Sequence, residues 1–280
     1  MVGVESVIPP DWSNLAGYGL LGDYVGGFWG TILSGIALVL LGATYWASKS
    51  LNYWTVSLSL FSEYLKTHDR NAEGMESKRI LEEFAYAYQE AMKVDPDWDV
   101  RDKIDIAYNY VFYGASSGPK EDLGRRFNPE DIHTLHNALS SKKNSEPNIE
   151  RRFFNGHQHR LSHYMRNLFN AYVFIDELRV TDAGKYQLGR LLRTKLSNYD
   201  QAVLALNILS SLGREWERLG LVECYRPVCN VPQDFYGYDQ DLTLKLLFPT
   251  IRFEWERRLL PPPKYWSGAL GRLTIVVGLR

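Results

Sequence analysis

An uncharged apolar stretch near the start of the chain dominates its hydrophobic pattern. Residues 24–48 contain no Asp, Glu, Lys or Arg and read YVGGFWGTILSGIALVLLGATYWAS. At 1.5 Å per residue, roughly twenty helical residues cross a hydrocarbon core about 30 Å thick. Trp29 near one end and Tyr45 and Trp46 near the other occupy positions typical of the aromatic belts of membrane proteins. The pattern predicts a transmembrane helix; the alternative is a buried core helix.

The charges on either side of this stretch indicate its orientation. The residues before it carry acidic side chains but no Lys or Arg, which argues against a secretory signal peptide. Lys49, Lys66 and Arg70 follow it, and basic residues favour the cytoplasmic side. Cys224 and Cys229 fit neither a zinc knuckle nor a disulfide framework, which favours a reducing compartment. We therefore expect a single-pass protein with a cytoplasmic C-terminal part.

Small residues recur within the predicted span. Gly26, Gly30 and Ser34 follow one another at intervals of four, a pattern that lets two transmembrane helices approach closely. We therefore expect these residues to pack in the membrane and the protein to form a homo-oligomer in the lipid bilayer.

Beyond the span the hydrophobic period is mostly helical. LNYWTVSLSLFSEYLKTH is expected to continue the first helix, and ESKRILEEFAYAYQEAM carries an amphipathic stripe. KIDIAYNYVFYG predicts a further helix that ends at Gly114. TLKLLFPTIRFEWERRLL is broken at Pro249 and fits either strand or helix. A few strands are compatible with the pattern, but no alternation of strands and helices is evident.

Two further helices carry clear start signals. Asn128 and Pro129 precede acidic residues, as at a capped helix N-terminus. Ser197 and Asp200 have the spacing of a capping box, and Gly213 is expected to stop the helix that they begin. Residues 140–148 are expected to form a loop or hinge.

The composition, with 45% hydrophobic and 23% charged residues, is typical of a globular chain. The predicted fold class is mainly α, with one N-terminal transmembrane helix followed by a helical cytoplasmic domain. We expect a short extracytoplasmic tail (1–23), the transmembrane helix (24–48), the helical cytoplasmic domain (49–260, with its densest signals at 150–228) and a C-terminal tail (261–280).

A histidine-rich stretch, GHQHRLSHYMRNLFN, suggests three kinds of chemistry, of which the first is metal binding. His159 and His163 have the i, i+4 spacing of zinc ligands on one helix, and the earlier stretch IHTLH adds His133 and His136. No acidic residue is interleaved between them and no cysteine is near. The pattern therefore favours no metal site, and no cofactor is predicted.

The second kind is ribonuclease chemistry. Arg152 and His157 have the spacing of the arginine and histidine in HEPN-type ribonucleases, where a general base beside a cation could stabilise a phosphorane. Phe153 follows the arginine where that motif normally has a polar residue. A formal net charge of −1 gives no overall electrostatic case for a nucleic-acid partner. These two residues remain the candidate catalytic pair of an alternative hypothesis.

The third kind is a binding face. If the stretch is helical, its polar residues form one stripe, and Leu161, Met165 and Leu168 point elsewhere, toward a core. Imidazole, guanidinium and carboxamide groups bind one another or an anionic partner. The predicted binding or trigger-sensing residues are His159, His163, Arg166, Asn167 and Asn170, with Arg190, Arg193, Ser197 and Asn207 in the following segments.

The same residues carry a family resemblance. GHQHRLSHYMRNLFNAYVFID and KYQLGRLLRTKLSNYDQAVLALNILSSLG resemble the signature of the putative phage abortive infection protein family, and LLGDYVGGFWGTILSGIALVLL and IAYNYVFYG resemble further parts of it. Met165 and Asp200 depart mildly from its pattern, and many members have two spans. The matching positions are His163, Tyr164, Arg166, Ile175, Asp176, Tyr186, Arg193, Leu196, Ser197 and Asn207.

The resemblance implies bacterial antiphage defence by growth arrest or death of the infected cell, and no established catalytic residues. We accordingly expect an inner-membrane effector that senses a phage component, another defence protein or nucleic acid and then disrupts the membrane. The alternatives are a membrane-tethered HEPN-like ribonuclease and a scaffold without catalysis that recruits another effector.

Overall fold

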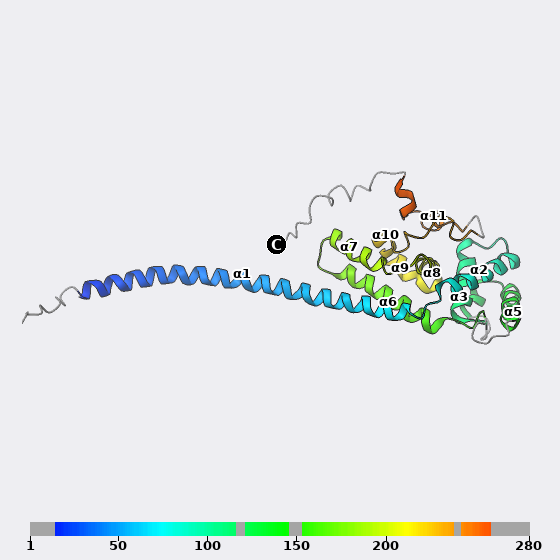
Figure 1. Ribbon diagram of the computed structural model, residues 1–280, viewed down its shortest axis with the longest axis horizontal. Helices are drawn as coiled ribbons and strands as arrows, with labels where there is room; N and C mark the ends of the chain where they lie inside the picture. The colour runs from blue at the N-terminus through cyan, green and yellow to red at the C-terminus, as the bar shows by residue number, and fades with distance from the viewer. Residues whose placement is uncertain (1–14, 116–120, 146–152, 238–241, 259–280) are drawn as a thin grey trace, which may run out of the picture. The chain divides into compact units, whose positions relative to one another are not determined.

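The computed structural model describes residues 15–115, 121–145, 153–237 and 242–258 (Figure 1), and all regular elements in these ranges are helical. The chain divides into two compact units, residues 1–59, here the apolar unit, and residues 60–280, here the helical unit. The longer helices are α1 (Leu15–Ala72), α2 (Ser77–Val94), α3 (Val100–Tyr113), α5 (Pro129–Ser145), α6 (Gln158–Glu177), α7 (Asp182–Arg193) and α8 (Asn198–Leu209). Shorter ones are α4 (Glu121–Arg126), η3 (Ser211–Gly213), α9 (Arg214–Arg218), α10 (Leu221–Tyr225), α11 (Leu244–Leu247) and η4 (Glu254–Arg258).

Helix α1 is long and apolar enough to cross a membrane. From Tyr24 to Leu60 its large apolar side chains are exposed, including Leu38 at 70% and Val39 at 72%. The hydroxyls of Thr31, Thr44 and Thr55 donate to carbonyls of their own helix, three or four residues earlier. None of its most apolar 18 residues is buried within the described part of the molecule, so the alternative of a buried core helix finds no support. The helix continues to Ala72, as LNYWTVSLSLFSEYLKTH predicted.

The helical unit buries one aromatic-rich core. Helix α2 packs against α3, α5 and α8, and α3 also packs against α6 and α8. Helix α8 lies among the other helices (Figure 1), and its residues from Gln201 to Leu209 are all buried. The largest fully buried side chains are Tyr88, Tyr108, Tyr164, Tyr172, Phe84, Phe154 and Phe253. The predicted mainly α fold class, with an apolar N-terminal helix and a helical remainder, is confirmed.

Local signals set most helix ends. Helix α3 begins after Asp99, whose carboxylate accepts a hydrogen bond from the backbone N–H of Arg101 at 2.7 Å, and ends before Gly114. Helix α5 starts at Pro129 and continues to Ser145, so the prediction of a loop or hinge over residues 140–148 was wrong for 140–145; residues 146–148 lie outside the described residues. Helix α8 starts at the predicted capping box, in which Ser197 and Asp200 bond each other's backbone. The prediction that Gly213 stops this helix was wrong.

Helix α8 ends four residues before Gly213, where Ser210 adopts an extended backbone and its hydroxyl donates to the carbonyl of Asn207 at 2.8 Å. The chain then turns through η3, and a Cβ on Gly213 would lie 2.0 Å from the Asn207 carbonyl oxygen. Gly213 thus permits a close backbone approach rather than a helix stop. The segment TLKLLFPTIRFEWERRLL, for which the sequence allowed either strand or helix, contains the two short helices α11 and η4.

Candidate functional site

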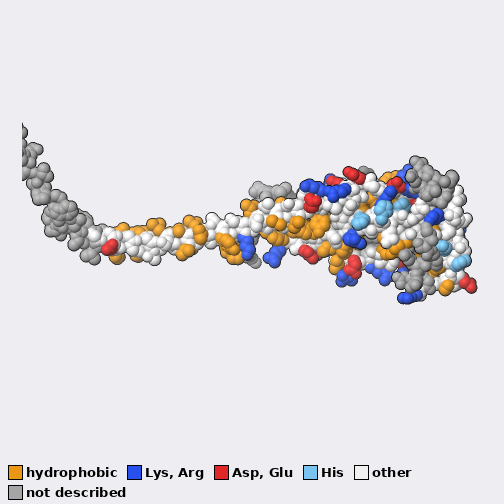
Figure 2. Space-filling view, turned by 90° about the horizontal axis from the view of Figure 1, so that it is seen from below, with side chains coloured by type: hydrophobic (Ala, Val, Ile, Leu, Met, Phe, Trp, Pro, Cys, Tyr) orange, Lys and Arg blue, Asp and Glu red, His pale blue; other side chains and the backbone are white. Residues whose placement is uncertain are grey.

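A row of polar side chains is exposed along α6. His159, His163, Arg166 and Asn170 are all exposed, while Asn167 is half-buried and donates to the backbone carbonyl of Tyr64 at 3.4 Å. The opposite side of the helix is buried, with Leu161, Tyr164, Met165, Leu168 and Tyr172 in the core. In Figure 2 histidine, lysine and arginine side chains lie near one another on the visible face of the helical unit. The predicted separation into a polar stripe and a core face is therefore present; its role in binding stays a prediction.

The stripe is bordered by a chain of charged groups. Arg160 on α6 lies 3.6 Å from Glu76, Glu76 lies 3.1 Å from Arg79, and Arg79 lies 3.4 Å from the carboxylate of Glu83. The first three side chains are at least partly exposed, whereas that of Glu83 is fully buried. Exposed pairs contribute little to stability because water screens them. The buried end of the chain therefore matters most for the fold.

At that end Glu83 holds the start of α6. One carboxylate oxygen lies 3.0 Å from Nε2 of His157, and the other accepts a hydrogen bond from the backbone N–H of Phe154 at 2.9 Å. The backbone N–H of His157 donates to the carbonyls of Val111 and Phe112 at 3.1 and 3.0 Å. A buried carboxylate needs such partners, because leaving it without them costs several kcal/mol.

Two glycines allow this loop to reach α3. Gly114 and Gly156 both have positive φ, 82° and 87°. A Cβ on Gly114 would lie 2.7 Å from the carbonyl oxygen of Phe154, and a Cβ on Gly156 would lie 2.7 Å from that of Tyr113. Glycine is therefore required at both positions by conformation and by space.

This placement bears on the ribonuclease alternative. His157 is 7% exposed, and its imidazole contacts a buried carboxylate instead of an open surface. Arg152 lies outside the described residues. The structure thus gives His157 a structural task, and the catalytic pair stays a prediction without geometric support.

The other predicted binding residues divide between surface and interior. Arg190 and Ser197 are exposed, whereas Arg193 and Asn207 are buried. The guanidinium of Arg193 donates to the carbonyls of Tyr225 and Arg226 at 3.2 and 3.1 Å. Helix α10 ends at this point because Arg226 adopts a left-handed backbone, φ 51°. Arg193 therefore caps α10 from inside the unit, a task different from that of an exposed binding residue.

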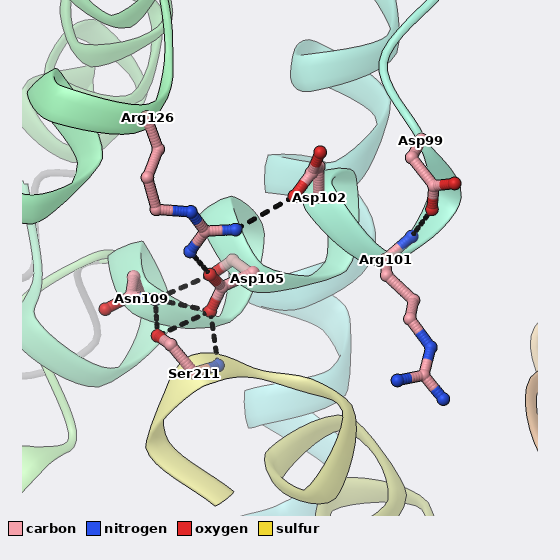
Figure 3. Close-up of polar contacts among 7 residues, drawn as sticks. All are labelled: Asp99, Arg101, Asp102, Asp105, Asn109, Arg126 and Ser211. Atoms are coloured by element: carbon pink, nitrogen blue, oxygen red, sulfur yellow. Dashed lines mark hydrogen bonds and ion pairs between the residues drawn. The ribbon is translucent and has the colours of Figure 1, made fainter. Parts of the chain in front are cut away.

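An acidic centre that the sequence reading missed lies on α3 (Figure 3). Asp105 is 2% exposed and accepts hydrogen bonds from the backbone N–H and hydroxyl of Ser211, both at 2.7 Å, and from the amide of Asn109 at 3.0 Å. Its second oxygen accepts from Arg126, which also bonds Asp102 at 2.9 Å. Asp105 thus joins α3, α4 and the start of η3. An acid and an amide at i, i+4 inside the apolar run KIDIAYNYVFYG were the available signal.

A second missed group lies where the last turns of α1 enter the helical unit. Asp200 of the capping box also accepts from the hydroxyl of Ser77 at the start of α2. His68 of α1 is buried nearby, with its ring 5.0 Å from that of Tyr164. Nothing in THDRN marks this histidine as buried, so no sequence signal could have found it.

The remaining histidines lie on α5, where Nδ1 of His136 is buried without a hydrogen-bond partner among the described residues. Nδ1 of His133 lies 3.1 Å from the amide of Asn137, and Nε2 of His136 lies 3.3 Å from the hydroxyl of Ser140. Cys224 is exposed and Cys229 is buried. Among the residues that the structure describes, no three His, Cys, Asp or Glu side chains gather as metal ligands would.

Comparison with known proteins gives one match. Residues 156–236 match the model of a family described as putative phage abortive infection protein. The matched segment contains α6, α7, α8, α9 and α10, and the resemblance predicted from the sequence is confirmed. No curated protein and no solved structure matched the chain.

Proposed function

Because residues 156–236 carry the features of the putative phage abortive infection protein family, we propose that this protein is a membrane-anchored effector of bacterial abortive infection. In this proposal the helical unit senses a phage-related trigger in the cytoplasm and α1 then damages the inner membrane. One observation carries the proposal: the same chain contains the matched segment 156–236 and a helix that is long and apolar enough to cross a membrane. The scaffold and ribonuclease alternatives have no specific observation in their favour.

The surface of α1 supports self-association in the bilayer. From Gly26 to Ser59 one face carries a small or polar residue at nearly every third or fourth position, which places them on one side of a helix. The opposite face carries bulky apolar side chains at intervals of seven, namely Ile32, Val39, Trp46 and Tyr53. The small or polar face is formed by Gly26, Gly30, Ser34, Ala37, Thr44, Ser48, Asn52, Thr55 and Ser59.

Polar groups inside a membrane generally face a bundle interior or a water-filled cavity. In an oligomer of this chain the small or polar face would meet the same face of other copies, and the apolar face would meet lipid. Within residues 24–48 this face carries the hydroxyls of Ser34, Thr44 and Ser48, with Leu41 among them, and the bundle is proposed to open a narrow path for ions there. Leakage of ions along this path would depolarise and arrest the cell.

The exposed stripe on α6 supports a sensing role. His159, His163 and Arg166 have no acidic partner within the described residues, unlike Arg160, which pairs with Glu76. A guanidinium offers several donors in a fixed geometry and suits a carboxylate, a phosphate or a carbonyl-rich surface. The trigger is therefore proposed to present anionic or carbonyl groups, whether it is a phage component, another defence protein or a nucleic acid.

Induced expression with two simultaneous readouts tests the proposal. Membrane potential is followed with a voltage-sensitive dye, and total RNA is examined for fragmentation in the same culture. Early depolarisation with intact RNA is expected. RNA cleavage before depolarisation would replace the proposal with the ribonuclease alternative, and growth arrest without either would favour the scaffold.

Fractionation tests the location directly. The full-length protein should sediment with the inner membrane and require detergent for release. A protease added outside intact spheroplasts should leave the helical unit uncut, because that unit is proposed to be cytoplasmic. Recovery of the protein in the soluble fraction would end the membrane proposal.

A further inference from the structure

The last turns of α1 are held inside the helical unit by a small set of contacts. Phe61 is buried, the ring of Tyr64 lies 5.4 Å from that of Phe174, and Asn167 donates to the carbonyl of Tyr64 at 3.4 Å. Leu65 and Ala72 also pack against the core, and Asp69 and Lys195 form an ion pair that is 2.9 Å long and about half exposed. A long hydrogen bond and an exposed ion pair each contribute little. The docking of residues 60–72 therefore depends mainly on the burial of a few side chains, and a charge placed on one of them would weaken it.

His68 is such a group. It is 1% exposed, and neither of its ring nitrogens has a hydrogen-bond partner among the described residues. The hydroxyl of Tyr164, whose ring it contacts, is also buried without a described partner. A neutral imidazole tolerates this apolar contact far better than an imidazolium, which carries a charge and two N–H donors.

The charged groups around His68 are already engaged with other partners. On its own helix Asp69 pairs with Lys195, and Lys195 itself adds a positive charge facing His68 from the segment after α7. On α8 the carboxylate of Asp200 accepts from the hydroxyls of Ser77 and Ser197. From α6 the facing titratable group is Tyr164. Burial is the largest influence and lowers the pKa of His68 below its usual 6.5, although Asp69 and Asp200 oppose it.

We propose that His68 makes the docking of α1 sensitive to pH. Protonation of its imidazole undocks residues 60–72 from α6. Because the pKa is lower in the docked state, the undocked state binds more protons as the pH falls below 6.5. Docking is strongest above pH 6.5 and weakens as the pH falls toward the lowered pKa. The docking equilibrium shifts by up to about tenfold for each pH unit in this window.

This release has a consequence that rests on the proposed function. A membrane that leaks ions loses its proton gradient, and the cytoplasm of a cell in acidic surroundings then falls in pH. Undocking of residues 60–72 would free the segment of α1 that continues into the apolar unit. The first pores would thus recruit further molecules, and arrest would become irreversible.

Hydrogen exchange on the detergent-solubilised full-length protein tests the switch without reference to killing. After correction for the intrinsic pH dependence of exchange, protection of amides in residues 60–72 should fall several-fold or more between pH 7.5 and 5.5. Amides of residues 202–208 in α8 should show no such loss, since only a local opening is expected. Unchanged protection of 60–72, or an equal loss throughout the helical unit, would overturn the proposal.

Two variants assign the effect to His68. His68→Gln cannot ionise and should abolish the pH response of residues 60–72, and His68→Phe serves the same purpose if the glutamine variant fails to fold. His163→Gln is the matched control, because His163 is exposed on α6 beside Tyr164, and it should retain the full response. A persisting response in both His68 variants, or its loss in His163→Gln, contradicts the proposal.

The failure of this switch and the failure of the proposed function can be told apart. Depolarisation without a pH response at residues 60–72 would remove the switch and leave the effector proposal standing. A local pH response in a protein that never depolarises cells would retain the switch and remove the effector proposal.

Discussion

The carboxylate of Glu83 and the imidazole of His157, 74 positions apart in the sequence, lie 3.0 Å from each other in the buried interior of the helical unit. Together with the bond from Phe154, this contact fixes the loop that precedes α6 against α2. The orientation of α6, and hence of its exposed polar stripe, depends on this contact. The residue that precedes the first turn of the proposed sensing helix is therefore held by an acid outside the matched segment 156–236.

Glu83→Gln should destabilise the helical unit on the order of 3 kcal/mol, because it removes the charge that two buried donors and Arg79 surround. Glu82→Gln, at the exposed neighbouring position on α2, is the control and should change stability within about 0.5 kcal/mol. Thermal melts of the detergent-solubilised proteins measure both. Equal melting of the two variants would show that the buried contact is dispensable.

The two carboxylates bound to Arg126 provide a second matched comparison. Asp105→Asn should cost about 3 kcal/mol, because Asp105 is buried and accepts from Ser211, Asn109 and Arg126. Asp102→Asn removes the bond to the same arginine from a carboxylate that is 42% exposed, and should cost about 1 kcal/mol or less. Urea unfolding followed by near-UV circular dichroism checks the order. A larger loss for Asp102→Asn would refute the assignment of Asp105 as the central acceptor.

These acids show where sequence reading succeeds and where it stops. Hydrophobic periodicity located α2 and α6 because each buries one apolar face. Helix α3 was found from its nearly continuous apolar run, since it is buried on all sides from Lys103 to Phe112, and the Ser197–Asp200 capping box is local in sequence. Periodicity states that a residue is buried but not which residue it meets, so the partner of Glu83 could not be predicted. The early end of α8 was missed for a different reason: the chain turns locally at Ser210, whose hydroxyl bonds the Asn207 carbonyl, and Gly213 lies in the turn and not at the helix end.

The candidate site was predicted in outline. The i, i+4, i+7 spacing placed His159, His163 and Arg166 on one exposed face of α6, because that spacing is fixed by helix geometry. The same reasoning could not separate Arg193 from this group. An arginine that caps another helix from inside the fold looks identical in sequence to an exposed one.

Replacing both Gly26 and Gly30 by Leu should reduce the yield of crosslinked oligomers in membranes severalfold, because close helix approach requires small residues. A Cβ at either position meets nothing within 4 Å, so the isolated α1 should tolerate the change. The control is the pair Gly35→Leu and Gly42→Leu, equally unobstructed and located away from the small or polar face by the 100° rotation per residue. Equal loss in both pairs would indicate a general effect on insertion, and no loss in the first pair would place assembly elsewhere.

Arg166→Ala should abolish defence against phage while leaving the melting temperature of the protein unchanged within about 1–2 °C, the shift expected for a surface change below about 0.5 kcal/mol. Arg166 is exposed and has no ion-pair partner within the described residues, so its removal leaves no buried group unsatisfied. Arg193→Ala should instead lower stability by about 2 kcal/mol or more, because the carbonyls of Tyr225 and Arg226 lose their donor.

Arg218→Ala is the matched control for Arg166. It removes an exposed arginine of α9 whose ion pair within the described residues is with Glu215, three positions earlier, and it should affect neither defence nor melting. The measurements are plaque counts on cells that express each variant at equal levels and thermal melts of the purified proteins. If Arg166→Ala protects as well as the native protein, the α6 stripe is a solvated surface; if its melt falls with that of Arg193→Ala, the stripe is part of the folding network and the sensing proposal fails.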